Sequence, residues 1–187
     1  MTAIIFPGQG SQYLNMSMDF NENFDVSRKV FQEIEDSTKI NIRKIITENP
    51  SDILNQTNYT QISIFSASMA IYKSLVYEFG NETIKPKILL GHSLGEYSAL
   101  VAGNLIDITE ASILIKKRGE LMHSSIEPNV SGMAAIIGKN AYFIDDVIKK
   151  NNLKIVIAND NSPMQVVVSG LIKDINSSEQ VLSLIHI

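Results

Sequence analysis

The sequence of 187 residues contains no cysteine. It can therefore form no disulfide framework, no cysteine-ligated zinc site and no thiol nucleophile. The net charge of −4 is small and gives no support for nucleic acid or an anionic membrane as a partner. No apolar run approaches the length that spans a bilayer, and the first residues lack the basic and long apolar regions of a signal peptide. We therefore expect a soluble, cytoplasmic protein.

The most informative stretch joins a short apolar run, residues 88–90, to a helical pattern over residues 98–102. The first predicts a buried strand and the second a buried helix. Between them, residues 91–95 fit G-x-S-x-G, which in this context is typical of a nucleophile elbow. The bare pattern also arises by chance in turns, but the flanking elements favour the elbow. Ser93 is then an exposed nucleophile, and the amide of Leu94 faces the place where an oxyanion would form.

A second glycine-rich loop, residues 7–12, follows the first predicted strand, residues 2–6. It lacks the third glycine of a dinucleotide-binding motif, and no Gly-Lys-Ser/Thr follows. One interpretation is a simple strand-ending turn. The other is a loop whose amides face the same pocket as Ser93, because the carboxyl ends of parallel strands meet at one edge of a sheet.

The remaining first part of the chain is predominantly helical, with helices predicted over residues 25–38, 59–79 and 107–126. In the last of these, we expect Ile113, Leu114 and Leu121 to form the buried face. The basic run at residues 116–118 is typical of a solvated face, and the alternative is that one of the three cations turns inward.

The pattern changes after residue 130. A β-α-β-β order, followed by the start of another helix, predicts a small ferredoxin-like α+β unit. The predicted segments are a strand at 132–138, a helix at 142–150, strands at 154–158 and 165–169 joined by a loop at 159–163, and a helix from 172.

We therefore expect an α/β fold: an α/β-hydrolase-like parallel sheet with a nucleophile elbow, plus an incomplete ferredoxin-like α+β subdomain. The core is predicted over residues 1–130 and the small subdomain over residues 131–181. Residues 182–187 resemble translated sequencing-adapter DNA, so we leave them out of the fold as a non-native tail.

Taken together, the motifs resemble those of the malonyl-CoA:acyl carrier protein transacylase family, over almost the whole chain and in the family's order. The matching pieces are Phe6-Pro-Gly-Gln-Gly-Ser-Gln12, Gly91-His-Ser-Leu-Gly-Glu-Tyr-Ser-Ala-Leu100, Arg118-Gly119 with Met122, Gly132-Met-Ala-Ala135, and Asn161-Ser-Pro with Gln165-Val-Val-Val-Ser-Gly170. The resemblance implies an S-malonyltransferase. Its serine takes malonyl from malonyl-CoA as an ester, and the phosphopantetheine thiol of acyl carrier protein then accepts the group.

The resemblance also implies roles for individual residues. Ser93 corresponds to the nucleophile, and the amides of Gln9 and Leu94 correspond to the oxyanion hole. Arg118 corresponds to the partner of the malonyl carboxylate, a role that suits its bidentate and permanently charged guanidinium. The other residues that the resemblance places at the substrate are His92, Met122 and Asn161.

A serine nucleophile needs a general base within hydrogen-bond reach, and none of the three histidines fits. His92 adjoins the serine, where side chains diverge; His123 is typical of a helix surface; and His186 lies in the tail. In the family, the base comes from a later segment. We therefore expect the chain as given to be an inactive part of a longer enzyme.

Two other functions stay open: a serine hydrolase that removes acyl groups from carrier proteins, and a carrier-docking fragment without activity. Arg118 argues against the hydrolase, which has no need of a carboxylate partner. The sequence does not decide between fatty-acid synthesis and trans-acting polyketide synthesis.

We expect malonyl-CoA and acyl carrier protein as partners of a monomer, with no cofactor, no metal, and no nucleic-acid or membrane partner.

Overall fold

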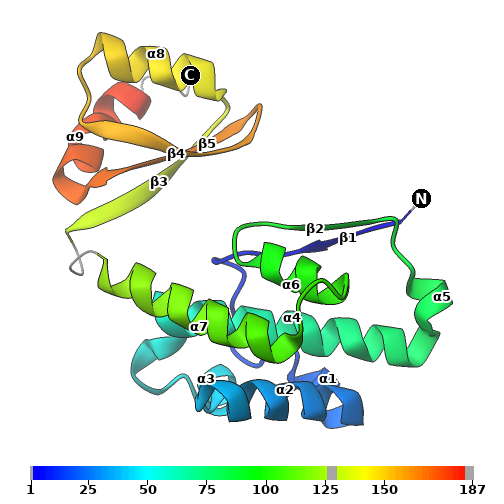
Figure 1. The fold of residues 1–187 in the computed structure, drawn as a ribbon. Helices are drawn as coiled ribbons and strands as arrows, with labels where there is room; N and C mark the ends of the chain where they lie inside the picture. The colour runs from blue at the N-terminus through cyan, green and yellow to red at the C-terminus, as the bar shows by residue number, and fades with distance from the viewer. Residues whose placement is uncertain (1, 126–129, 184–187) are drawn as a thin grey trace. The chain divides into compact units, whose positions relative to one another are not determined.

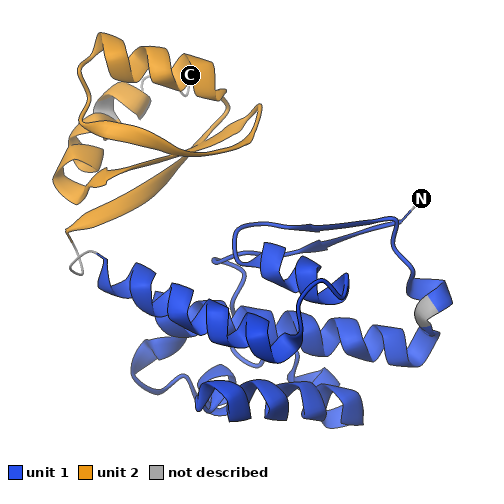
Figure 2. Cartoon of the chain, in the orientation of Figure 1, with its two compact units in different colours: residues 1–125 blue, residues 126–187 orange. Residues whose placement is uncertain are grey.

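The computed structural model describes residues 2–125 and 130–183. The chain divides into two compact units, residues 1–125 (unit 1) and 126–187 (unit 2), as Figure 2 shows. The sequence prediction placed this boundary after residue 130.

The expected fold class, α/β with a parallel sheet and an elbow, is confirmed. No helix in the described ranges combines the length and apolar character needed to cross a membrane.

Unit 1 contains a two-stranded parallel sheet, β1 (Ala3–Phe6) and β2 (Ile88–Gly91). Helix α6 (Gly95–Ala102) follows β2 directly and packs against both strands (Figure 1). Phe6 also meets Tyr72 of α4 (Thr57–Phe79) edge to face, with ring centroids 5.8 Å apart. On the other face, Ile5 is 69% exposed. One face of this sheet is therefore buried against helices, and the other is apolar and open.

The core of unit 1 lies mainly among three helices, α2 (Asp25–Thr38), α4 and α7 (Ile108–Ser124). Helix α2 has the predicted bounds, because Val30, Phe31 and Ile34 recur at helical spacing and are buried. The smaller helical elements of unit 1 are α1 (Met18–Asn23), α3 (Ile42–Glu48), the 3-10 helix η1 (Pro50–Asn55) and α5 (Asn81–Ile84).

The predicted buried face of α7 was wrong. Ile113, Leu114 and Leu121 are exposed, whereas Ala111, Ser112, Ile115 and Gly119 are among the buried residues. Helix α7 packs closely against α2 and α4, and a Cβ on Gly119 would lie only 3.0 Å from the Cα of Asn58 on α4. Small side chains such as Ala111 and Gly119 permit this close approach, and Ile113, Leu114 and Leu121 lie on the exposed side of the helix.

Unit 2 is a three-stranded antiparallel sheet with two helices, formed in the predicted β-α-β-β-α order. Its elements are β3 (Ser131–Ile137), α8 (Ala141–Lys150), β4 (Ile155–Ser162), β5 (Gln165–Leu171) and α9 (Ile172–Ser183). The strand order is β3-β5-β4, and α8 and α9 share one core with the strands. This part of the fold prediction is confirmed.

Two local expectations for unit 2 need correction. Residues 159–162 continue β4 instead of forming a loop, because register shifts between Ile157 and Asn159, and between Asp160 and Ser162, keep the strand paired with β5. In addition, Leu182 is buried in the core of unit 2, although we had left residues 182–187 out of the fold. Residues 184–187 lie outside the described residues.

Candidate active site

The turn that carries Ser93 is shaped by the close approach of three backbone segments. A Cβ on Gly91 would overlap the backbone of Gly95, and a Cβ on Gly95 would overlap the carbonyl oxygen of Phe6. Glycine is therefore required at both positions. Ser93 between them has φ of 55°, a left-handed conformation that is uncommon for residues other than glycine. The strand, the strained turn and the helix form the predicted nucleophile elbow.

The loop after β1 lies against this turn. A Cβ on Gly8 would lie 2.6 Å from the carbonyl oxygen of His92, so the two loops pack backbone to backbone. The neighbouring Gln9 is exposed, and its Nε2 donates to Oγ1 of Thr57 at the start of α4, at 3.2 Å. The carboxyl ends of both strands thus meet at one place, as expected for parallel neighbours.

Leu94, the other residue predicted to supply an oxyanion-hole amide, directly follows the serine. Its side chain is fully buried and anchors the start of α6 in the core of unit 1. The first amides of a helix carry partial positive charge, which favours an anion at this end. The structure therefore brings Ser93, Leu94 and the loop of Gln9 together.

Arg118 is the cation of the basic run that turns toward the serine. Its Nη2 donates to Oγ of Ser93 at 2.9 Å. The two other cations point elsewhere: Lys116 Nζ donates to the carbonyl oxygen of Thr38 at 2.8 Å, and Lys117 is exposed. The run is therefore divided, with one member at the candidate site and two outside it.

Sequence reasoning missed Gln61 of α4, which is 0% exposed. Its Oε1 accepts a hydrogen bond from Nη1 of Arg118, and its Nε2 donates to Sδ of Met122 at 3.2 Å. Met122 was predicted at the site and is linked to Arg118 through this amide. The available signal was a glutamine at the head of a buried run of apolar and small residues, where a polar side chain needs partners.

The predicted histidines and Asn161 lie as follows. His92 is exposed and its Nδ1 faces Gly8, while His123 is exposed on α7. Within the described residues, the hydrogen bond to Oγ of Ser93 comes from Arg118 and not from either histidine. Asn161 belongs to unit 2, where its Nδ2 donates to Oε1 of Gln165 at 3.1 Å. His186 lies outside the described residues.

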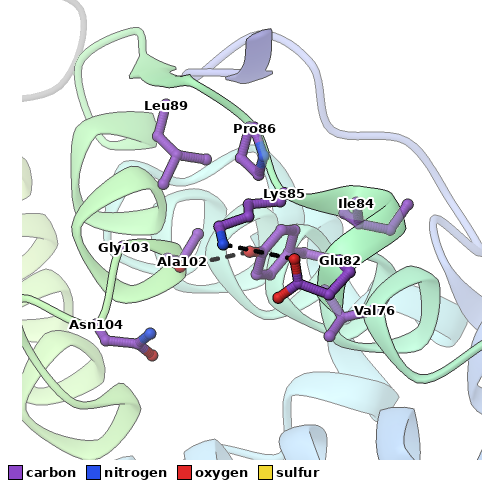
Figure 3. Close-up of a pocket in the computed structure, with 10 residues that line it drawn as sticks. Val76, Glu82, Ile84, Lys85, Pro86, Leu89, Ala102, Gly103 and Asn104 are labelled. Carbon is purple, nitrogen blue, oxygen red and sulfur yellow. Dashed lines mark hydrogen bonds and ion pairs between the residues drawn. The ribbon is translucent and has the colours of Figure 1, made fainter. Parts of the chain in front are cut away.

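The cavity drawn in Figure 3 lies at the other end of the sheet. Its volume is about 370 Å³, and its lining includes Pro86, Leu89 and Asn104. Lys85 and Glu82, which both line it, form an exposed ion pair at 3.5 Å. None of the residues assembled around Ser93 lines this cavity. Chemistry at Ser93 must therefore use the opposite, carboxyl end of the strands.

The arrangement around Ser93 suits acyl transfer. A hydroxyl on a strained turn, beside a helix start and in contact with a permanent cation, is placed where negative charge develops during attack on a carbonyl. The guanidinium also offers a carboxylate-binding group next to the reacting oxygen.

Comparison with known proteins agrees with this geometry. The chain matches the family model described as "Acyl transferase domain" over residues 3–183. It is 35% identical to a malonyl CoA-acyl carrier protein transacylase of Haemophilus influenzae over 170 residues, which cover 90% of this chain and 54% of the relative. The chain therefore spans about half the length of the curated relatives it matches.

Solved structures agree as well. The transacylase structure from Clostridium perfringens is 32% identical with a TM-score of 0.88, covering 98% of this chain and 58% of that one. A type II polyketide-synthase acyl carrier protein in complex with its malonyl transacylase matches at 34% identity and a TM-score of 0.87, covering 98% and 59%. The resemblance expected from the motifs is confirmed, and the chain belongs to the acyl transferase domain family.

Proposed function

We propose that this chain supplies the nucleophile and the carboxylate-binding cation of a malonyltransferase, which moves malonyl from malonyl-CoA to the phosphopantetheine thiol of acyl carrier protein. The observation that carries the proposal is the 2.9 Å contact between Arg118 Nη2 and Ser93 Oγ. In a malonyl ester, a single methylene separates the ester carbonyl from the carboxylate. A guanidinium that touches Oγ is therefore also within reach of the carboxylate.

In the proposed first step, Oγ of Ser93 attacks the thioester carbonyl of malonyl-CoA. The Oγ–C bond forms, the C–S bond breaks, and coenzyme A leaves as the thiol once it takes up the serine proton. The amides of Leu94 and Gln9 hold the oxyanion, a contribution for which the loss of one donor typically costs about 3 kcal/mol. In the second step, the carrier thiol attacks the seryl ester and regenerates the hydroxyl.

The general base of this reaction is proposed to be a histidine that residues 1–187 do not supply, as the family resemblance implies. Within the described residues, neither His92 nor His123 forms a hydrogen bond with Oγ of Ser93, and the donor to this oxygen is a guanidinium, which does not act as a base. Removal of a catalytic partner from a serine site lowers kcat by orders of magnitude. We therefore expect residues 1–187 alone to show no measurable transfer.

The partners follow from the same proposal. The relatives are named for malonyl-CoA and acyl carrier protein, and one of the solved structures is a carrier complex. We propose both as partners of this chain in the cytoplasm, with the protein acting as a monomer. Either a fatty-acid or a polyketide carrier would satisfy this chemistry, and transfer assays with one carrier of each kind would distinguish them.

Product analysis tests the function against the hydrolase alternative. The assay uses a hybrid enzyme, in which residues 3–183 of this chain replace the matching segment of the Haemophilus influenzae relative. With malonyl-CoA and holo carrier protein, we expect malonyl-carrier as the product. Without carrier, free malonate should form far more slowly. Equal release of malonate with and without carrier would contradict the transferase and support the hydrolase.

A further inference from the structure

Gln61 is a polar side chain buried in the core of unit 1, at 0% exposure. Glutamine is mostly a surface residue, and an amide buried without partners is costly. Both ends of this amide are bonded, Oε1 to Nη1 of Arg118 and Nε2 to Sδ of Met122. Its burial is thus tied to the candidate active site.

The chemistry of the two partners fixes the orientation of this amide. A guanidinium can only donate hydrogen bonds, and a thioether sulfur can only accept them. Only the orientation with Oε1 toward Arg118 and Nε2 toward Met122 satisfies both. The flipped amide would place its N–H groups against the guanidinium N–H groups. Gln61 is therefore locked as an acceptor facing Arg118.

The guanidinium of Arg118 is in turn held at two points. Nη1 is bonded to Gln61, and Nη2 is bonded to Oγ of Ser93 at 2.9 Å. An arginine side chain has large rotamer freedom, which a bond to a buried, locked acceptor restricts. With one proton of Nη1 engaged by Gln61, the Nε–H and a further N–H of Nη2 remain for side-on, bidentate binding of a carboxylate.

Two features suit Gln61 to holding the Arg118 guanidinium in one orientation. The amide of Gln61 is neutral, so it orients the guanidinium of Arg118 without cancelling the positive charge. A carboxylate at the same place would compete with the carboxylate of the substrate for this cation. The helix carrying Arg118 also approaches α4 very closely, since a Cβ on the next residue, Gly119, would lie 3.0 Å from the Cα of Asn58. This approach brings Arg118 within reach of Gln61.

We propose that Gln61 is a positioning residue that aims the Arg118 guanidinium at Ser93, and thereby sets the preference of the site for acyl groups ending in a carboxylate. This inference rests on the proposed function and adds to it the residue that determines its substrate selectivity. Gln61 itself acts through Arg118 and needs no contact with the acyl group.

The variants that test this role are Gln61→Met, which keeps the size but loses the acceptor, and Gln61→Glu, which keeps the acceptor but adds a charge. Gln32→Met is the matched control. Gln32 Oε1 also accepts from an arginine, Nη2 of Arg43 at 3.0 Å, but this pair links α2 and α3 outside the site. Circular dichroism and urea unfolding check that each variant is folded.

The first measurement is NMR of the arginine side-chain N–H groups in residues 1–187, with the Arg118 signals assigned by their absence from Arg118→Lys. In the unmodified chain, we expect slow rotation of the Arg118 guanidinium and slow exchange of its protons with water. Gln61→Met should speed both about tenfold or more, as expected for loss of a hydrogen bond to a charged group. Gln61→Glu should keep them slow, and Gln32→Met should leave Arg118 unchanged. Unchanged Arg118 signals in Gln61→Met would overturn the positioning role.

The second measurement is kcat and KM of the hybrid enzyme for malonyl-CoA and acetyl-CoA. Because the carboxylate is bound in both ground and transition states, Gln61→Met should raise KM for malonyl-CoA about tenfold to a hundredfold with little change in kcat. Acetyl-CoA should be affected less than about threefold. Gln61→Glu should lose malonyl preference at least as strongly, since the added carboxylate neutralises Arg118. An equal loss for both substrates would indicate a merely structural residue and overturn the proposal.

The two measurements distinguish failure of the proposed malonyltransferase function from failure of the proposed role of Gln61. A hybrid enzyme that carries the unmodified segment and transfers no malonyl contradicts the proposed function. The NMR measurement still decides whether Gln61 positions Arg118. If malonyl transfer is present and Gln61→Met leaves the malonyl-to-acetyl ratio unchanged, the selectivity role of Gln61 fails while the transferase stands.

Discussion

The two ends of the β1–β2 sheet are packed very differently. At the carboxyl end, Gly8, Gly91 and Gly95 each leave no room for a Cβ, and Ser93 is held at a positive φ between them. At the amino end of β2 there is a cavity of about 370 Å³ with an exposed ion pair. Backbone strain persists only where the surroundings enforce it. The tight end is therefore the one suited to holding a reactive group in place.

Matched glycine substitutions at the two ends should show the largest difference. Gly95→Ala would drive a methyl group into the carbonyl oxygen of Phe6, a rigid backbone atom, and we expect a loss of about 3 kcal/mol in the free energy of unfolding. Gly103 lines the cavity, and a Cβ there would meet its nearest atom at 3.3 Å. Gly103→Ala should therefore change the free energy of unfolding by less than about 1 kcal/mol. Urea unfolding followed by circular dichroism measures both. Equal losses would show that the two ends are equally constrained.

Two cations of α7, Arg118 at the candidate site and Lys116 outside it, should differ in their effect on the preference for malonyl over acetyl. Arg118→Ala removes the proposed, half-buried partner of the acyl carboxylate. We expect the transition-state stabilisation that kcat/KM reports for malonyl-CoA to fall by about 1.5–3 kcal/mol. The difference in kcat/KM between malonyl-CoA and acetyl-CoA should become smaller. Lys116→Ala loses a bond to the carbonyl oxygen of Thr38 and should leave the malonyl-to-acetyl ratio of the hybrid enzyme unchanged. An unchanged ratio in Arg118→Ala would make Arg118 an ordinary surface cation.

The smallest effect is expected at the open end, from the phenol of Tyr72. Burial raises the pKa of Tyr72, and its hydroxyl makes only a long contact of 3.4 Å with the carbonyl oxygen of Ala102. A raised folded-state pKa gives a stability contribution that is complete below the unfolded-state pKa of about 10 and is lost as pH rises through the folded-state value. Tyr72→Phe should therefore match the unmodified chain at pH 8.

The same variant should lose less stability above pH 10, because it has no phenol to ionise. Thermal melting at pH 8 and at about pH 11 measures the difference. A steeper alkaline loss in Tyr72→Phe than in the unmodified chain would contradict the assignment of this titration to Tyr72.

The elbow and the second unit could be predicted because their signals are local. The pattern around Ser93 needs only a strand, five residues and a helix, and helix α2 follows directly from the spacing of Val30, Phe31 and Ile34. The same holds for the β-α-β-β-α order of unit 2. In each case, neighbouring residues determine the element.

What sequence reasoning missed depends on long-range contacts. Gln61 and Arg118 are 57 positions apart, so no local pattern links them. The buried face of α7 was predicted from its larger apolar residues, but close helix packing selected small ones such as Ala111 and Gly119. Asn161 was predicted in a loop because Asn, Asp and Ser favour turns, whereas pairing with β5 overrides that preference through register shifts.

The site of acylation tests directly whether Ser93 is the nucleophile. The hybrid enzyme is incubated with malonyl-CoA without carrier, quenched in acid, and analysed by intact mass and peptide mapping. We predict one malonyl ester, located on Ser93, which is absent from Ser93→Ala and present in Ser11→Ala. Ser11 is the control because its hydroxyl lies in the neighbouring glycine-rich loop, bonded to the carbonyl oxygen of Gly8 at 2.8 Å. A malonyl ester that forms equally well in Ser93→Ala would contradict the assignment of Ser93 as the nucleophile.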